Sequence, residues 1–120
     1  MAENNRLTGL LQALARIAGR SLPVDHGGNF VFSAWIRIPE TFRGKQISAV
    51  LPGFPTAAAW PADFKSRGQW QRIWARANLP DDAQSVSCGI VADAEANDVF
   101  HSTSWCLERG TRPLGYGFVL

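Results

Sequence analysis

The chain has 120 residues, of which 46% are hydrophobic, 18% charged and 11% aromatic, with 12 basic against 10 acidic side chains. This length fits a single domain over residues 1–120, and the five Trp and seven Phe can build a core, which excludes disorder throughout. A net charge of +2 does not by itself indicate a nucleic-acid partner. The low charged fraction leaves more of the surface than usual neutral or apolar.

The two cysteines, Cys88 and Cys106, are too few for a disulfide framework, and no C-x-x-C motif or His/Cys cluster indicates zinc. The N-terminal segment lacks the apolar run of a signal peptide, and no stretch approaches the roughly 18 apolar residues of a membrane span. We therefore expect a cytoplasmic protein that uses no metal or other cofactor and does not enter a membrane.

The first half of the chain combines one helical pattern with strand patterns. Residues 5–19 carry apolar side chains at the spacing of one helix face, which predicts a helix. Residues 30–38 alternate between an apolar face and a more polar one, which predicts a strand, and residues 46–51 predict a second strand that could form a hairpin with it. Three prolines favour an apolar loop over residues 52–62.

Residues 66–78 predict a second helix. Ser66 and Gln69 fit a capping box, and an apolar stripe with Trp70 and Trp74 follows at helical spacing. The arginines of this segment lie mostly away from the stripe, so the Trp pair is expected to face the core.

The last third predicts three strands joined by short links, so these strands should pair antiparallel. They cover residues 85–90, 99–107 and 115–120, with an acidic hairpin loop over residues 92–97. The element order is then α-β-β-α-β-β-β. The predicted fold is a single α+β domain, a mainly antiparallel sheet of about five strands packed by two helices.

The sequence contains no clear set of catalytic residues. The only histidines are His26, in a Gly-rich loop, and His101, within a predicted strand. No spacing pairs either histidine with a nucleophile and a carboxylate. A small enzyme or ligand-binding domain with a pocket near His26 or His101 therefore stays an alternative interpretation, and no catalytic residue is assigned.

The Arg and Trp content of residues 66–78 raises a second alternative. Arg67, Arg72 and Arg76 accompany Trp70 and Trp74, and such a set can follow phosphates and stack on bases. This segment could make the protein a direct nucleic-acid-binding domain, although the same Trp spacing also fits a core stripe.

Several aromatic side chains do not fit one core face, which favours an aromatic contact surface with an arginine rim. An acidic segment could also meet a basic groove on a partner. The predicted partner-binding residues are Phe54, Trp60, Phe64, Arg67, Arg72, Arg76, Asp93, Glu95 and Asp98.

We therefore predict a small non-enzymatic binding or inhibitor protein that occupies a site on a larger protein or ribonucleoprotein partner, with a homodimer also possible. Its general profile resembles that of small inhibitors of host nucleic-acid defence encoded by phages and mobile elements, such as anti-CRISPR proteins. The resemblance is one of small size, a single α+β domain, absent catalytic motifs and mixed charge patches, and no sequence motif carries it.

Overall fold

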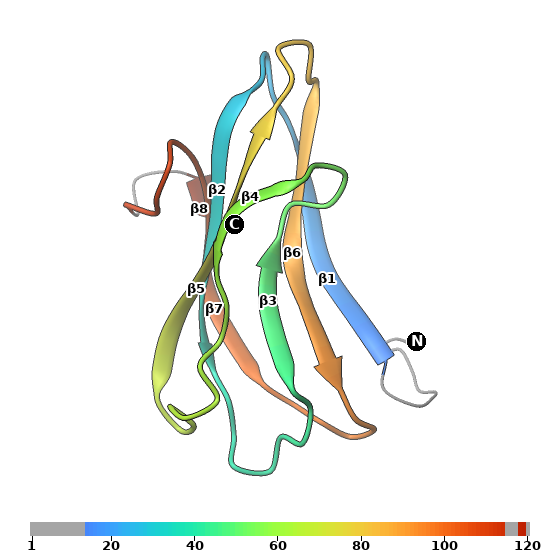
Figure 1. Ribbon diagram of the computed structural model, residues 1–120, viewed down its shortest axis with the longest axis vertical. Coiled ribbons are helices and arrows are strands. Elements are labelled where there is room, and N and C mark those ends of the chain that lie inside the picture. The colour runs from blue at the N-terminus through green and yellow to red at the C-terminus, as the bar shows by residue number, and fades with distance from the viewer. Residues whose placement is uncertain (1–13, 115–117, 120) are drawn as a thin grey trace.

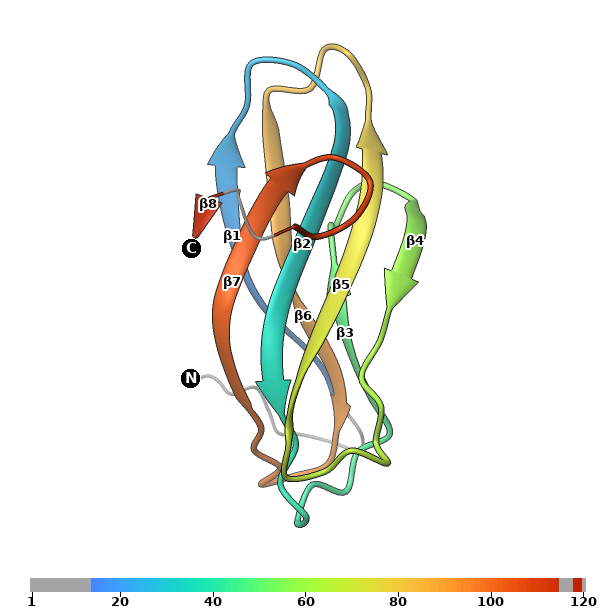
Figure 2. The same cartoon turned by 90° about the vertical axis from the view of Figure 1, so that its left-hand side faces the viewer.

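The computed structural model describes residues 14–114 and 118–119, which form two antiparallel β-sheets packed face to face (Figure 1). One sheet has three strands in the order β1-β6-β3, and the other has five in the order β4-β5-β2-β7-β8. Their bounds are β1 Leu14–Pro23, β2 Gly28–Arg37, β3 Gln46–Val50, β4 Thr56–Trp60, β5 Trp70–Leu79, β6 Ser85–Ala94, β7 His101–Arg109 and β8 Phe118–Val119. In Figure 2 the five-stranded sheet faces the viewer and the three-stranded sheet lies behind it.

The strands pair from the outside of the chain inward. β1 pairs with β6, and β2 pairs with β5. β3 and β4 lie between β2 and β5 in the chain, and each belongs to a different sheet. This is the pairing of a long antiparallel ribbon wrapped around a core, as in a jelly roll. β7 then adds to the free edge of β2, and β8 adds to β7.

The predicted α+β fold is wrong. The described residues form no helix, and hence none with the length and apolar character needed to cross a membrane. A three-stranded sheet takes the place that the two helices were expected to fill. Of the helix predicted over residues 5–19, residues 5–13 lie outside the described residues, and the chain from Leu14 onward forms β1.

The helix predicted over residues 66–78 is also wrong, because this part of the chain contains β5. Its apolar residues satisfy two periods at once, since Ile73 and Ala77 fit a helical stripe and also the alternation of a strand. The structure follows the strand period: Ile73, Ala75, Ala77 and Leu79 are buried, and the residues between them are more exposed.

The strand predictions for residues 30–38 and 46–51 are confirmed by β2 and β3, but their predicted hairpin is wrong because the two strands lie in different sheets. The segment 52–62 contains β4 in addition to a loop.

Strands are also confirmed near 85–90 and 99–107 as β6 and β7, and β8 falls within residues 115–120. β6 extends through Ala94 into the expected loop, and it pairs with β1 and β3 rather than with β7. The predicted antiparallel pairing of the last two strands is confirmed.

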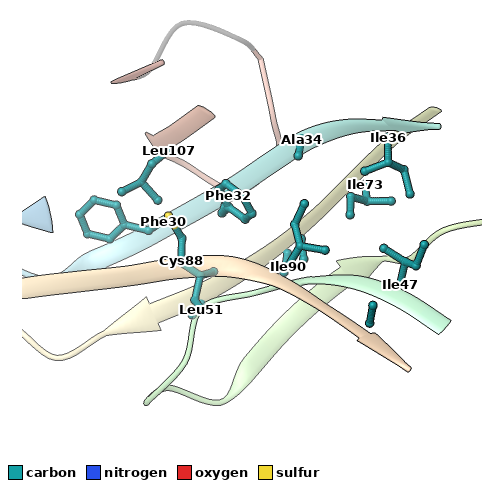
Figure 3. Close-up of a cluster of buried hydrophobic side chains, with 14 of the residues drawn as sticks. Phe30, Phe32, Ala34, Ile36, Ile47, Leu51, Ile73, Cys88, Ile90 and Leu107 are labelled. Atoms are coloured by element: carbon teal, nitrogen blue, oxygen red, sulfur yellow. The ribbon is translucent and has the colours of Figure 1, made fainter. Parts of the chain in front are cut away.

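The core lies between the sheets (Figure 3). β2 contributes its inward residues Phe30, Phe32, Ala34 and Ile36, all at most 4% exposed, and these meet the inward side chains of β3 and β6. Burying a Phe or Ile side chain contributes roughly 1.5–3 kcal/mol, so this double layer of apolar strands stabilises the fold without a helix.

A β-bulge in β7 changes which of its residues face the core. The register between β2 and β7 shifts between Ser33 and Trp35, and Ser104 in β7 has a φ of 56°. The extra residue reverses the alternation. As a result Trp105 turns inward, where its ring meets Phe32 edge-on with centroids 5.2 Å apart.

Candidate functional site

The outer surface of the five-stranded sheet carries tryptophan and arginine side chains on three adjacent strands. In β5 the residues that alternate with the buried ones point away from the core, and they are Trp70, Arg72, Trp74, Arg76 and Asn78. The same side of the sheet carries Trp35 and Arg37 from β2 and Trp60 from β4. We name the seven Trp and Arg residues among them the Trp/Arg face; it is the side of the sheet turned toward the viewer in Figure 2.

The pairing of the strands places arginines directly beside tryptophans. Trp35 in β2 lies opposite Arg72 in β5, and Arg37 lies opposite Trp70. The Arg37 guanidinium carbon is 5.7 Å from the centre of the Trp70 ring, within the range of a cation–π interaction. Indole rings and guanidinium groups thus form one mixed surface.

Three of the four tryptophans of this face are exposed to solvent, and Trp74 is partly exposed. Trp60 is 63% exposed, Trp70 is 47% exposed and Trp35 is 39% exposed. Trp60 also lies opposite Trp74 across the β4–β5 ladder. Several large exposed apolar side chains on one face are typical of an interaction surface.

The charge of the face has one sign. Strands β2, β4 and β5 contain no Asp or Glu. Within the described part of the chain, no ion pair includes Arg37, Arg72 or Arg76. The face therefore presents cationic side chains whose charge is not neutralised by neighbouring carboxylates.

Two of these arginines each have a buried N–H group that donates no hydrogen bond within the described residues. In the residues that the structure describes, the Nε atoms of Arg72 and Arg76 are buried and have no hydrogen-bond partner. The Arg72 Nη2 group donates a hydrogen bond of 3.2 Å to the Ser33 hydroxyl. An unsatisfied buried donor costs roughly 1–3 kcal/mol, a cost that natural proteins tolerate mainly where the group serves another purpose.

Toward β8 the outer side of the sheet is covered. Val31, Ser33 and Cys106 point outward but are at most 5% exposed. Nearby, the Glu108 carboxylate is 7% exposed and accepts a hydrogen bond of 3.0 Å from the Leu114 backbone N–H. Because Val31 lies opposite Arg76 and Ser33 opposite Trp74, the most open part of the Trp/Arg face is the part that holds Trp35, Trp60 and Trp70.

Three predicted partner-binding residues come together on this face, namely Trp60, Arg72 and Arg76. Phe54 lies elsewhere, in the loop between β3 and β4, where its ring is half-buried against the core. Of the predicted aromatic partner-binding residues Phe54, Trp60 and Phe64, only Trp60 therefore lies on the Trp/Arg face.

Phe64 and Arg67 belong to the loop between β4 and β5, at the end of the sandwich. The Arg67 Nη1 group donates hydrogen bonds to the carbonyl oxygens of Pro39, at 3.0 Å, and Phe42, at 2.7 Å. Its guanidinium also lies over the Phe64 ring, at 5.3 Å, and that ring packs against Phe42. These contacts give the two side chains a role in holding the β2–β3 loop to the β4–β5 loop.

The acidic residues lie away from the Trp/Arg face. Asp98 accepts three backbone hydrogen bonds, from Arg43 at 3.0 Å, from Gly44 at 2.8 Å and from Glu95 at 2.8 Å. Glu95 forms an exposed ion pair with Arg43 at 3.6 Å, and Asp93 is in β6 of the other sheet. The structure therefore places the predicted acidic and Arg/Trp contacts in different regions of the surface.

The two histidines occupy opposite ends of the sandwich. His26 precedes β2, whereas His101 lies opposite Arg37 at the last residue of β2, so about 30 Å of strand separates them. His26 is exposed and lies 2.7 Å from Asp25, and this hydrogen bond is the main reason that the pKa of the Asp25 carboxyl is lowered. The histidines therefore cannot share one pocket.

The two cysteines lie in different sheets, and no disulfide joins them. Burial raises the pKa of the Cys88 thiol to about 11, because the core penalises the thiolate. A thiol in this state is a poor nucleophile at neutral pH.

The predicted partner-binding residues do not include Trp35, Arg37, Trp70 or Trp74. Trp70 and Trp74 entered only through the alternative interpretation of residues 66–78 as a nucleic-acid-binding helix. The sequence pattern that indicates an outward position for both Trp residues is present in residues 70–79, where small and aliphatic residues alternate with Trp and Arg. Reading this segment as a strand would have assigned both Trp residues to the outer side.

Comparison of the chain with protein-family models, with curated proteins and with solved structures found no match.

Proposed function

We propose that this chain is a non-enzymatic binding domain that docks onto a larger, negatively charged macromolecular partner through the Trp/Arg face. The observation that carries the proposal is that this face combines exposed tryptophans with arginines that form no ion pair within the described residues. The three strands that hold these side chains contain no Asp or Glu.

The chemistry of these side chains supports docking. Trp and Arg are the residue types most enriched among those that dominate binding energy at interfaces. Covering Trp35, Trp60 and Trp70 removes large apolar surfaces from water, which favours association. Carboxylates or phosphates of a partner would supply the acceptors that Arg37 and Arg76 lack within the described residues.

The alternative of a small enzyme with a pocket near His26 or His101 has less support. The separation of the two histidines requires two independent sites, and the Cys88 thiol is buried with its pKa raised.

Quantitative affinity capture from the native host tests the proposal. The bait is the wild-type chain, a Trp60→Ala/Trp70→Ala double variant, or Val99→Ala, which truncates an exposed apolar residue in the β6–β7 loop. We expect a stoichiometric partner for the wild type and for Val99→Ala, with at least about tenfold less recovered by the double variant, a loss equivalent to about 1.4 kcal/mol. Equal recovery by all three baits would show that another surface makes the contact.

A further inference from the structure

Resting on the proposed function, we infer that the group bound by the Trp/Arg face is a single strand of nucleic acid, with its bases stacked on the indole rings and its phosphates paired with the arginines.

The first argument is the order of side chains along β5. Its outward residues are, in sequence, Trp70, Arg72, Trp74 and Arg76, followed by Asn78 at the end of the strand. Alternate residues of a strand are about 7 Å apart, so flat rings and positive charges alternate along one line. A single strand of nucleic acid is a polymer in which flat bases alternate with negative phosphates, and proteins bind it with this combination of groups.

The second argument is the width of the surface. Adjacent strands are about 4.8 Å apart, so Trp35 in β2 and Trp60 in β4 lie on either side of the β5 line. The sheet thus offers rings on three neighbouring strands, and sheet surfaces that bind RNA stack two or three bases in this way. A duplex would present only phosphates here, because its bases are stacked inside.

The third argument is charge. Arg37, Arg72 and Arg76 form no ion pair within the described residues, and Glu108, the acidic residue on the outer side of β7, is buried. A second copy of the chain is a poor occupant, because it would bring three further arginines to the same surface. An acidic polypeptide would satisfy the arginines, but only nucleic acid carries a flat ring beside every negatively charged group of its chain.

The experiment measures binding of a fluorescein-labelled oligothymidylate of about eight nucleotides by polarisation, together with quenching of intrinsic Trp fluorescence. Four proteins are compared: wild type, Trp70→Ala, Arg37→Gln, and Arg20→Gln. Arg20 is an exposed arginine in β1 of the other sheet, so Arg20→Gln removes the same charge without touching the face. Thermal unfolding of each variant verifies that it is folded.

We expect the oligonucleotide to quench Trp fluorescence and to bind with a salt slope of magnitude about 2, since three arginines each contribute about 0.7. Arg37→Gln should lower that slope by about 0.7 and Trp70→Ala should weaken binding at least about fivefold, whereas Arg20→Gln should match the wild type at moderate salt. A duplex of the same length should bind more weakly than the single strand.

The inference is overturned if the oligonucleotide does not bind at low salt, or if Arg20→Gln weakens binding as much as Arg37→Gln. An acidic polypeptide and an anionic polysaccharide serve as competing probes. Binding of either probe that depends on Trp70 and Arg37, without oligonucleotide binding, would overturn the nucleic-acid inference and leave the proposed function intact. If the face variants retain full capture of the native partner, the proposed function fails instead.

Discussion

Replacing Asp98 by Ala should destabilise the protein although this residue is far from the Trp/Arg face. Its carboxylate accepts backbone hydrogen bonds from Arg43, Gly44 and Glu95, and it thereby joins the β2–β3 loop to the β6–β7 loop. The sequence predicts that Asp98 binds a basic groove on a partner, whereas the hydrogen bonds of its carboxylate give it a structural role.

The magnitude follows from the three lost bonds. Hydrogen bonds to a charged group contribute roughly 1.5–3 kcal/mol each when buried, and partial solvation of this half-buried site reduces that to about 1 kcal/mol each. We expect Asp98→Ala to lower the free energy of unfolding by about 3 kcal/mol. For a domain of this size that corresponds to a fall in Tm of about 12 °C.

The matched control is Glu95→Ala, which removes the same charge from the same loop. Its carboxylate forms an ion pair with Arg43 in which the two side chains are 50% and 64% exposed, so the loss should be below about 0.5 kcal/mol. Differential scanning calorimetry of the two variants and the wild type provides the comparison. Equal shifts in Tm for Asp98→Ala and Glu95→Ala would refute the reasoning, because they would show that only net charge matters.

Four further predictions concern the core and one close backbone contact. Phe32→Ala should cost about 3–5 kcal/mol in denaturant unfolding, because this ring is fully buried, and a loss below about 1 kcal/mol would contradict the assigned core. Alkylation of Cys88, followed by mass spectrometry, should be slow at pH 8 and rise toward pH 11; labelling at the rate of the unfolded chain would argue against burial. Because its pKa rises from 9.0 to about 11 on folding, the stability linked to this thiol is present below pH 9 and lost as pH rises toward 11, which unfolding at both pH values measures. Gly44→Ala should destabilise by more than about 2 kcal/mol, since a Cβ would collide with the Asp93 carbonyl oxygen; an unchanged Tm would contradict that geometry.

The relation between sequence and structure is clearest in β5. The sequence contains both a helical stripe, with Trp70 and Trp74, and an alternation that buries Ile73 and Ala75. Local pattern could not choose between them, because large aromatic residues fit either a core or an interaction surface. The choice follows from the second sheet, whose β6 residues, including Ile90, pack against the aliphatic side and leave the indoles outside.

The β-bulge in β7 is a second feature that no period in the sequence reveals. Strict alternation would place His101 and Trp105 on the same side, and it left the buried side of this strand undecided. The extra residue near Ser104 places His101 outside and Trp105 against the core. A bulge depends on the register with β2, which is a property of the paired strands and not of β7 alone.

The sequence by itself determined the strands with one clear apolar side, above all β2 with Phe32 and Ile36, because alternation that buries large side chains has a single low-energy solution. It also showed that the acidic residues and the Arg/Trp residues occupy different segments. Only the tertiary structure decided that the second layer is a sheet and that three strands distant in sequence combine into the Trp/Arg face. The physical reason is that nested strand pairing brings residues 35–37, 60 and 70–76 side by side through long-range hydrogen-bond ladders, which no local pattern encodes.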